Sequence, residues 1–153
     1  MIACVLYDYQ TTRSGKHPAK FLKEFKGYLH TDGYGGYNVL PNIILVGCWA
    51  HARRKFDEAL KALPASQKNT PTVAGEGLNF CNKLFAIERE LQDVTPDERY
   101  QKRIEQSRPV LDAFRDWLKY QTPRVLPKSA LGQAIRYCRN QWDKLGGFMK
   151  DGR

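Results

Sequence analysis

The sequence predicts an α/β fold in two successive parts, an α/β core over residues 1–64 and an all-helical part over residues 65–153. In the first part, short β-rich apolar runs alternate with apolar residues at helical spacing. Residues 65–77 are rich in Ser, Thr, Pro, Ala and Gly and are predicted to form a loop. Beyond this loop only helical periodicity remains, so we place the domain boundary after Pro64.

Three strands are expected in the first part. Ile2–Tyr7 is an apolar run too short for a helix, and a polar loop follows it, so it is predicted to be a buried strand. Tyr28–Asp32 ends in a carboxylate just before a glycine-rich turn. Ile43–Val46 is a second short buried run and predicts the third strand.

Two helices accompany these strands. Pro18 suits a first helical turn, and the apolar residues after it share one face, which predicts a short helix that ends before Gly27. After the third strand, a second helix is predicted from apolar residues at helical spacing: Trp49, Ala52, Phe56, Leu60 and Leu63.

About three helices are predicted after the loop. Apolar residues at helical spacing run from Leu78 to Leu91. Thr95 and the Pro-Asp-Glu that follows combine a cap, a first-turn proline and an acid, so a second helix begins there, and Pro109 should kink it. The last helix is expected to run from Leu131 to Leu145, where two glycines end it.

Composition favours a cytoplasmic protein that binds a polyanion. Lys and Arg number 25 against 16 Asp and Glu, a net charge of +9, and nucleic acid is the commonest partner of such a chain; a basic surface that binds nothing is the alternative. No apolar run approaches the ~20 residues of a membrane span, and the first residues lack signal-peptide features. The four scattered cysteines predict free thiols rather than disulfides.

Two linked segments, residues 29–37 and 47–56, carry the residues best suited to chemistry. Asp32 ends a strand beside a flexible glycine turn, where a carboxylate can bind Mg²⁺ or Mn²⁺ and leave positions for phosphate and water. The alternative is an aspartate that only forms a turn before Gly33. Asp8 also ends an apolar run, and we interpret it as a turn residue.

The second segment starts a basic helix. His51 directly follows the third strand, so it is expected either to contact phosphate or organise the site near Asp32, or to bond to the backbone at a helix start. Cys48 and His51 have a spacing that zinc sites use, but no second compact pair of ligands exists, and zinc is not predicted. Arg53, Arg54 and Lys55 are expected to contact a DNA backbone or to form a solvated face.

These segments resemble the central segment of the DDE-type transposases of the insertion-sequence-66 group. The resemblance is carried by Asp32-Gly33-Tyr34-x-x-Tyr37 and by Cys48-Trp49-Ala50-His51-x-Arg53-Arg54-x-Phe56. It implies a partial ribonuclease-H-like core, with Asp32 as the second acid of a catalytic triad that holds two Mg²⁺ or Mn²⁺ ions. It also implies cleavage and joining of DNA, both transposon ends and target, by the full-length protein.

The same resemblance implies that this chain is a fragment. The first acid would lie on an earlier strand, and the third, a glutamate, would follow a stretch like Phe148–Arg153. One carboxylate cannot hold two metal ions, so the chain alone is expected to be inactive, without stably bound metal. Ile2–Tyr7 and Tyr28–Asp32 would be the third and fourth strands of the family sheet, so either they pair directly or a second copy supplies the missing edge.

DNA affinity is expected to remain. The residues predicted to contact DNA are Arg53, Arg54 and Lys55 of the basic helix, Tyr34, whose ring can stack on a base or pack in the core, and Arg13, which also matches the family pattern. One alternative is a stand-alone nucleic-acid-binding module or an accessory protein that pairs with a full-length transposase. Another is a nuclease in which four residues converge: Asp8, Asp32, His51 and Glu88.

Overall fold

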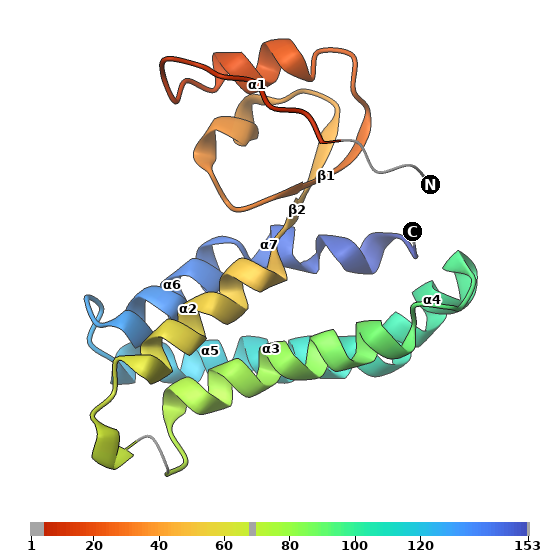
Figure 1. Ribbon diagram of the computed structural model, residues 1–153. Coiled ribbons are helices and arrows are strands. Elements are labelled where there is room, and N and C mark those ends of the chain that lie inside the picture. The colour runs from red at the N-terminus through yellow and green to blue at the C-terminus, as the bar shows by residue number, and fades with distance from the viewer. Residues whose placement is uncertain (1–4, 68–69, 153) are drawn as a thin grey trace.

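A small α/β part lies above a larger body of helices in the computed structural model, which describes residues 5–67 and 70–152 (Figure 1). The α/β part holds α1 (Lys16–Phe21), β1 (Gly27–Thr31), the 3₁₀ helix η1 (Gly35–Val39) and β2 (Ile43–Gly47). The helical body contains α2 (Trp49–Lys61), α3 (Val73–Glu90), α4 (Pro96–Lys102), α5 (Arg108–Gln121), α6 (Ala130–Asn140) and α7 (Trp142–Leu145). Shorter turns connect them: η2 (Ala65–Gln67), η3 (Arg103–Ser107), η4 (Thr122–Arg124) and η5 (Gly146–Lys150).

The two strands form a parallel pair. Gly27 lies opposite Ile43, and the register continues to Thr31 opposite Gly47. Both strands were predicted from their apolar runs, and both are confirmed within one residue. Residues 32–42 connect them through η1 rather than through an α-helix, so the crossover between the strands is unusually short.

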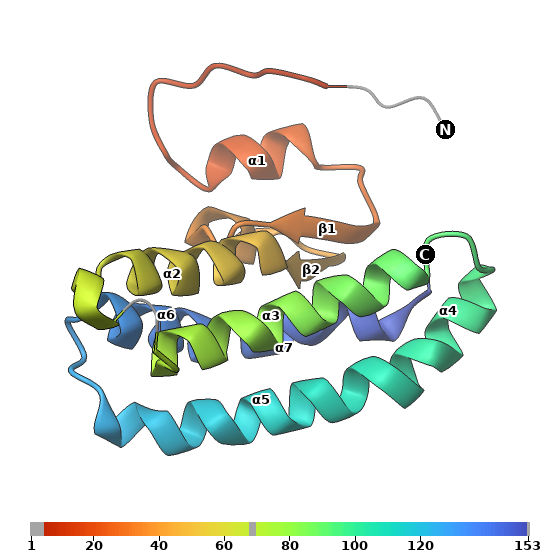
Figure 2. The same cartoon turned by 60° about the horizontal axis from the view of Figure 1, so that its bottom comes forward.

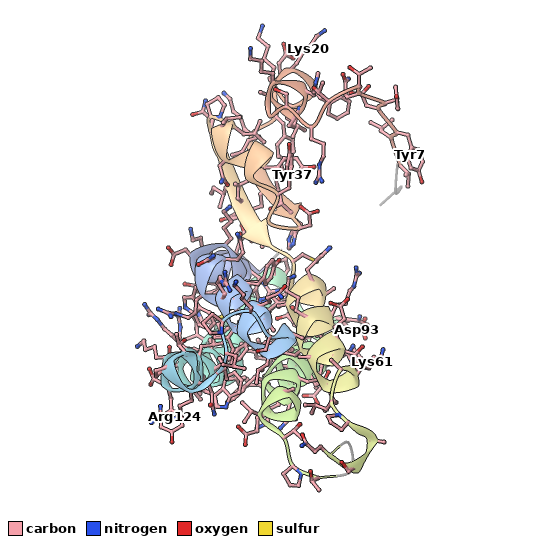
Figure 3. The ribbon with its side chains drawn as sticks, turned by 90° about the vertical axis from the view of Figure 1, so that its left-hand side faces the viewer. Tyr7, Lys20, Tyr37, Lys61, Asp93 and Arg124 are labelled. Carbon is pink, nitrogen blue, oxygen red and sulfur yellow. The ribbon has the colours of Figure 1, made fainter. Side chains whose placement is uncertain are left out.

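The predicted strand at Ile2–Tyr7 is wrong over its described residues. Val5, Leu6 and Tyr7 are in irregular chain and are 72%, 71% and 95% exposed, and Figure 3 shows Tyr7 standing away from the body; residues 2–4 lie outside the described residues. A β-rich run becomes a strand only where a partner strand and a packing surface receive it. Here β1 pairs with β2, and the described residues provide neither a partner strand nor a packing surface for Val5–Tyr7. The α/β architecture is therefore confirmed with two described strands instead of about three.

Four helices enclose the main core. Helix α2 packs against both α3 and α6, while α5 contacts α3 and α6 from the other side, and the four lie side by side in Figure 2. Phe56 and Phe114 are fully buried in this core, and Phe80 stacks on Phe114 with ring centroids 4.8 Å apart. The predicted apolar face of α2 is confirmed at Ala52 and Phe56. Among the described residues, no helix has the length and apolar character needed to cross a bilayer.

The helical part contains the three predicted helices, but two of them are divided, so that five α-helices, α3 to α7, are described. Helix α3 begins at Val73, inside the predicted loop, because the Thr72 hydroxyl accepts a hydrogen bond from the Gly75 N–H at 3.0 Å and caps it. The predicted cap at Thr95 is confirmed by a 3.3 Å hydrogen bond from the Glu98 N–H. The last helix is divided at Gln141 into α6 and α7 rather than running unbroken to Leu145.

The helix predicted to begin at Thr95 is interrupted by a π-helical turn. Residues 103–107 form this turn, η3, and Pro109 is the second residue of α5 directly after it. Proline lacks an N–H, so it disrupts the regular i to i−4 bonding of a continuous helix, and a wider turn before it accommodates the defect. The predicted irregularity therefore lies in the turn just before Pro109.

Candidate functional site at the carboxyl edge of the sheet

The parallel register brings the two predicted segments to one edge of the sheet. Thr31 and Gly47 end the two strands opposite each other, so Asp32 and Cys48 leave the sheet side by side. The Cys48 N–H donates to the Thr31 carbonyl at 3.0 Å, and α2 starts at the next residue. The carboxyl edge of parallel strands is the usual place for a ligand site in α/β proteins.

Asp32 forms a tight turn and remains exposed. Its Oδ1 accepts a hydrogen bond from the Tyr34 N–H at 2.9 Å, as in an Asx turn. Gly33 between them has φ of +90°, a backbone conformation that other residues rarely adopt. The Oδ2 atom forms no hydrogen bond or ion pair with the described residues, so Asp32 is a turn former that retains one free carboxylate oxygen.

Arg13 and Tyr34 lie beside Asp32 in a pocket of about 250 Å³. The Arg13 guanidinium lies 4.9 Å from the Tyr34 ring centroid, and the Tyr34 hydroxyl donates to the Arg13 carbonyl. Tyr37 packs edge-on against Tyr34 with centroids 5.7 Å apart. The structure therefore brings together three of the predicted site residues, and Tyr34 packs on both Arg13 and Tyr37 outside the main core.

Helix α6 reaches the same edge through Tyr137, which the sequence analysis missed. The Tyr137 hydroxyl donates to the Asp32 carbonyl at 3.1 Å, and the Lys55 ammonium lies 5.1 Å from the Tyr137 ring. Burial raises the pKa of Tyr137 from 10.0 to about 12, and Cys138, Cys48 and Asp32 add to this increase. Tyr137 lies 105 residues from Asp32, so no local pattern in the sequence indicates the contact.

The remaining predicted residues diverge along α2. His51 is half-buried in the first turn, and its Nδ1 is buried without a partner among the described residues. Arg53 donates from Nε to Asn82 of α3 at 2.7 Å. Arg54 is exposed and has no partner in the described part of the chain. With Lys55 directed to Tyr137, the basic run divides among three directions instead of forming one cationic face.

Comparison with known proteins gives the family. The sequence model of the Transposase IS66 family matches residues 2–153. The chain belongs to the IS66 transposase family.

Relatives in Sinorhizobium fredii cover nearly the whole chain. The uncharacterized protein y4hP is 30% identical over 97% of this chain and 29% of its own length. The uncharacterized proteins y4jD and y4qI are 29% and 30% identical over 95% and 97% of the chain. The chain thus spans less than a third of the length of these relatives. No solved structure gives a significant match.

A divalent metal, which DDE transposases generally use, does not fit the described residues alone. Residues 5–67 and 70–152 contain no group of three or more His, Cys, Asp or Glu side chains that could hold an ion. Asp32 is a single candidate ligand, and one carboxylate does not hold two metal ions. The acids considered for a nuclease site are bonded elsewhere: Asp8 accepts from the Gln10 amide at 2.7 Å, and Glu88 pairs with Arg103 at 2.6 Å.

Proposed function

We propose that this chain is the central part of a DDE transposase catalytic domain, in which Asp32 supplies one carboxylate to a divalent-metal site completed by other parts of a longer protein. The observation that carries this proposal is the exposed Asp32 turn at the carboxyl edge of a parallel strand pair, beside the start of α2. Membership of the IS66 transposase family supports strand cleavage and joining as the reaction of the longer protein.

The neighbouring residues suit contact with DNA. Arg13 and Tyr34 line the pocket that contains Asp32, so a phosphate or an unstacked base bound there would lie next to its carboxylate. Arg54 is exposed on α2 and can reach a phosphate, while Arg53 and Lys55 add positive charge nearby. The unpaired Nδ1 of His51 can bond to a group that completes the site.

A chimera tests the proposed role of Asp32. Residues 2–153 would replace the matching segment of y4hP, and transposition of a marked element would be measured in cells, with unaltered y4hP as the reference. Asp32→Asn should abolish transposition, because the neutral amide lacks the negative charge with which a triad carboxylate binds the metal ions. The matched variant Asp8→Asn should leave the frequency close to that of the parent chimera. Activity retained in Asp32→Asn would contradict the proposal.

The isolated chain gives a second test. We expect no nicking or joining of DNA with Mg²⁺ or Mn²⁺, because Asp32 belongs to no group of three or more His, Cys, Asp or Glu side chains among the described residues that could hold an ion. Metal-dependent nicking that is lost in Asp32→Ala would replace the transposase-segment proposal with the nuclease alternative.

Binding of nucleic acid without catalysis is the second candidate function. The net charge of +9 favours it, because nucleic acid is the commonest partner of a strongly basic chain.

A further inference from the structure

Positive charge is concentrated in the last third of the chain. Residues 115–144 carry seven Lys or Arg against two Asp, a net charge of +5, which is more than half of the +9 of the whole chain. Residues 88–105, by contrast, carry four Lys or Arg against six Asp or Glu. The excess therefore belongs to α5, α6 and their connection, and not to the helical body as a whole.

The fold arranges these cations along one groove. A hollow of about 260 Å³ lies between α5 and α6, and its charged lining residues are Arg115, Lys119, Arg139 and one acid, Asp143. A second hollow of about 390 Å³ continues along α6 and is lined by Arg136 and Arg139. Both hollows include Arg139 and Asn140, so they adjoin and form one groove with Arg139 at its centre. We define the α5–α6 groove by four cations: Arg115, Lys119, Arg136 and Arg139.

Neutral acceptors hold two of these cations without cancelling their charge. Arg139 donates from Nη1 to the Thr122 hydroxyl at 3.1 Å, and Arg136 donates to the Pro127 carbonyl. Arg115 has no partner among the described residues, and Lys119 pairs with Asp116 through side chains that are 61% and 77% exposed. An exposed pair of this kind contributes little and yields to a stronger anion.

We propose that the α5–α6 groove binds the phosphate backbone of duplex DNA. Its four cations extend over two helices and two adjoining hollows, which suits a series of phosphates better than a single small anion. At the far end of α5, the Arg124 guanidinium stacks on the exposed Tyr120 ring at 3.5 Å, and Figure 3 shows Arg124 at the outer edge of the body, on the opposite side from Lys61. This pair extends the cationic surface beyond the groove.

The groove is separate from the Asp32 pocket but shares a helix with it. The two sites have no lining residue in common. Tyr137 contacts Asp32 from one face of α6. At about 100° per residue, Arg139 lies about 160° from Tyr137 around the helix axis and Arg136 about 100° from it, so both arginines leave α6 in other directions than Tyr137. The inference rests on DNA as the partner in the proposed function and adds a second contact surface to it.

The test compares two variants of equal charge on the whole chain. Binding of a labelled 20-base-pair duplex would be measured by fluorescence anisotropy from 50 to 300 mM KCl. The triple variant Arg115→Gln, Arg136→Gln, Arg139→Gln should weaken binding roughly tenfold or more at 0.1 M salt and lower the log–log salt slope by about three. The control variant, with exposed Lys20, Lys23 and Lys26 changed to Gln, should change the slope by less than about one. Circular dichroism and melting temperature establish that both variants fold.

Every other outcome would contradict the proposal that the α5–α6 groove binds DNA. An equal change of the salt slope in both variants would mean a nonspecific charge effect. An unchanged slope in the triple variant would place the phosphate contacts elsewhere on the protein. Loss of DNA affinity only in the double variant Arg53→Gln, Arg54→Gln would do the same. Absence of duplex binding at 50 mM KCl, or binding of the parent chain to phosphatidylglycerol vesicles but not to DNA, would also overturn it. The result for the Asp32→Asn chimera is independent of these outcomes, because transposition reports on the reaction and the salt slope reports only on DNA binding.

Discussion

The α/β part and the helical body differ in how they cover their apolar side chains. The helical body encloses a cluster of nine residues that are 0–1% exposed. In the α/β part, α1 buries none of its residues, and among the described residues each strand of the two-stranded sheet has one edge without a partner strand. Large apolar side chains are exposed there: Val5, Leu6, Tyr7, Tyr9, Phe21, Phe25, Tyr28, Val39 and Ile44.

This difference shows that the helical body supports the Asp32 edge. The Trp49 indole donates to the Leu145 carbonyl at 2.9 Å, and Lys144 donates to the Asn38 side chain at 2.6 Å. Gly47 packs so closely on Leu145 that an added Cβ would lie 2.9 Å from its backbone nitrogen. Contacts between distant segments therefore position the residues of the motif, because two strands alone are not independently stable.

One substitution in each part of the molecule tests this difference most directly. Phe114→Ala removes a fully buried ring that stacks on Phe80, so it should lower the free energy of unfolding by about 3–5 kcal/mol. Phe21→Ala removes a ring that is 58% exposed and should cost less than about 1 kcal/mol. Urea unfolding followed by circular dichroism measures both. Equal losses would show that the α/β part has a core of its own.

The next largest effect should come from the arginine that anchors the C-terminal turn. Arg103 is 6% exposed; it binds both carboxylate oxygens of Glu88, at 2.8 and 2.6 Å, and the carbonyls of Phe148 and Asp151. Arg103→Met should cost about 2–3 kcal/mol, since it removes the ion pair with Glu88 and the hydrogen bond to the Phe148 carbonyl, although the partly exposed Glu88 limits the loss. Lys102→Met is the matched control: it breaks an exposed pair with Glu98 and should change stability by less than about 1 kcal/mol. Similar losses in both variants would contradict the anchoring role.

The sequence predicted those elements whose signals are local. The strands at Tyr28–Asp32 and Ile43–Val46 and the cap at Thr95 each depend on neighbouring residues, and all were found. Ile2–Tyr7 has the composition of a strand, but pairing depends on a partner far along the chain, and Val5–Tyr7 has none among the described residues. The start of α3 was missed because Thr72 resembles the loop residues that precede it.

The candidate site shows the same limit. Asp32 and Tyr34 were predicted from one motif and Arg13 from a separate segment that matches the family pattern, and the three lie together in one pocket. Tyr137 could not be found, because its hydrogen bond to Asp32 joins two elements that no periodic pattern connects. The arginines of the α5–α6 groove look like ordinary surface charges along each helix, and only the packing of α5 beside α6 makes them neighbours.

A smaller effect should separate two glycines of the helical body. A Cβ at Gly77 would lie 2.4 Å from the Phe56 ring, which is fully buried and cannot move aside easily. Gly77→Ala should therefore destabilise by about 1–2 kcal/mol, even though alanine favours helix by up to about 1 kcal/mol. A Cβ at Gly146 would meet nothing within 4 Å, so Gly146→Ala should be close to neutral. A stabilised Gly77→Ala would mean that the core around Phe56 is loosely packed.

The smallest effect is a loss of stability at alkaline pH that originates in the helical core. Burial raises the pKa of the Cys81 thiol from 9.0 to about 12, so the folded chain keeps this proton when the unfolded chain releases it. The stability from this shift is complete below pH 9 and declines as the pH rises toward 12. At pH 9.5 the loss should be about 1 kcal/mol relative to pH 7.5.

Two cysteine variants test this origin. Cys81→Ala should be less stable than the parent at pH 7.5 but should lose less between pH 7.5 and 9.5, because the titrating thiol is gone. Cys48→Ala, at a half-buried position on the sheet edge, should follow the pH dependence of the parent. Urea unfolding in reducing buffer at each pH provides the measurement. If the free energy of unfolding fell equally with pH in all three proteins, the alkaline loss would arise outside the packing around Cys81. The difference between a closed helical core and an open α/β part would then lack this support.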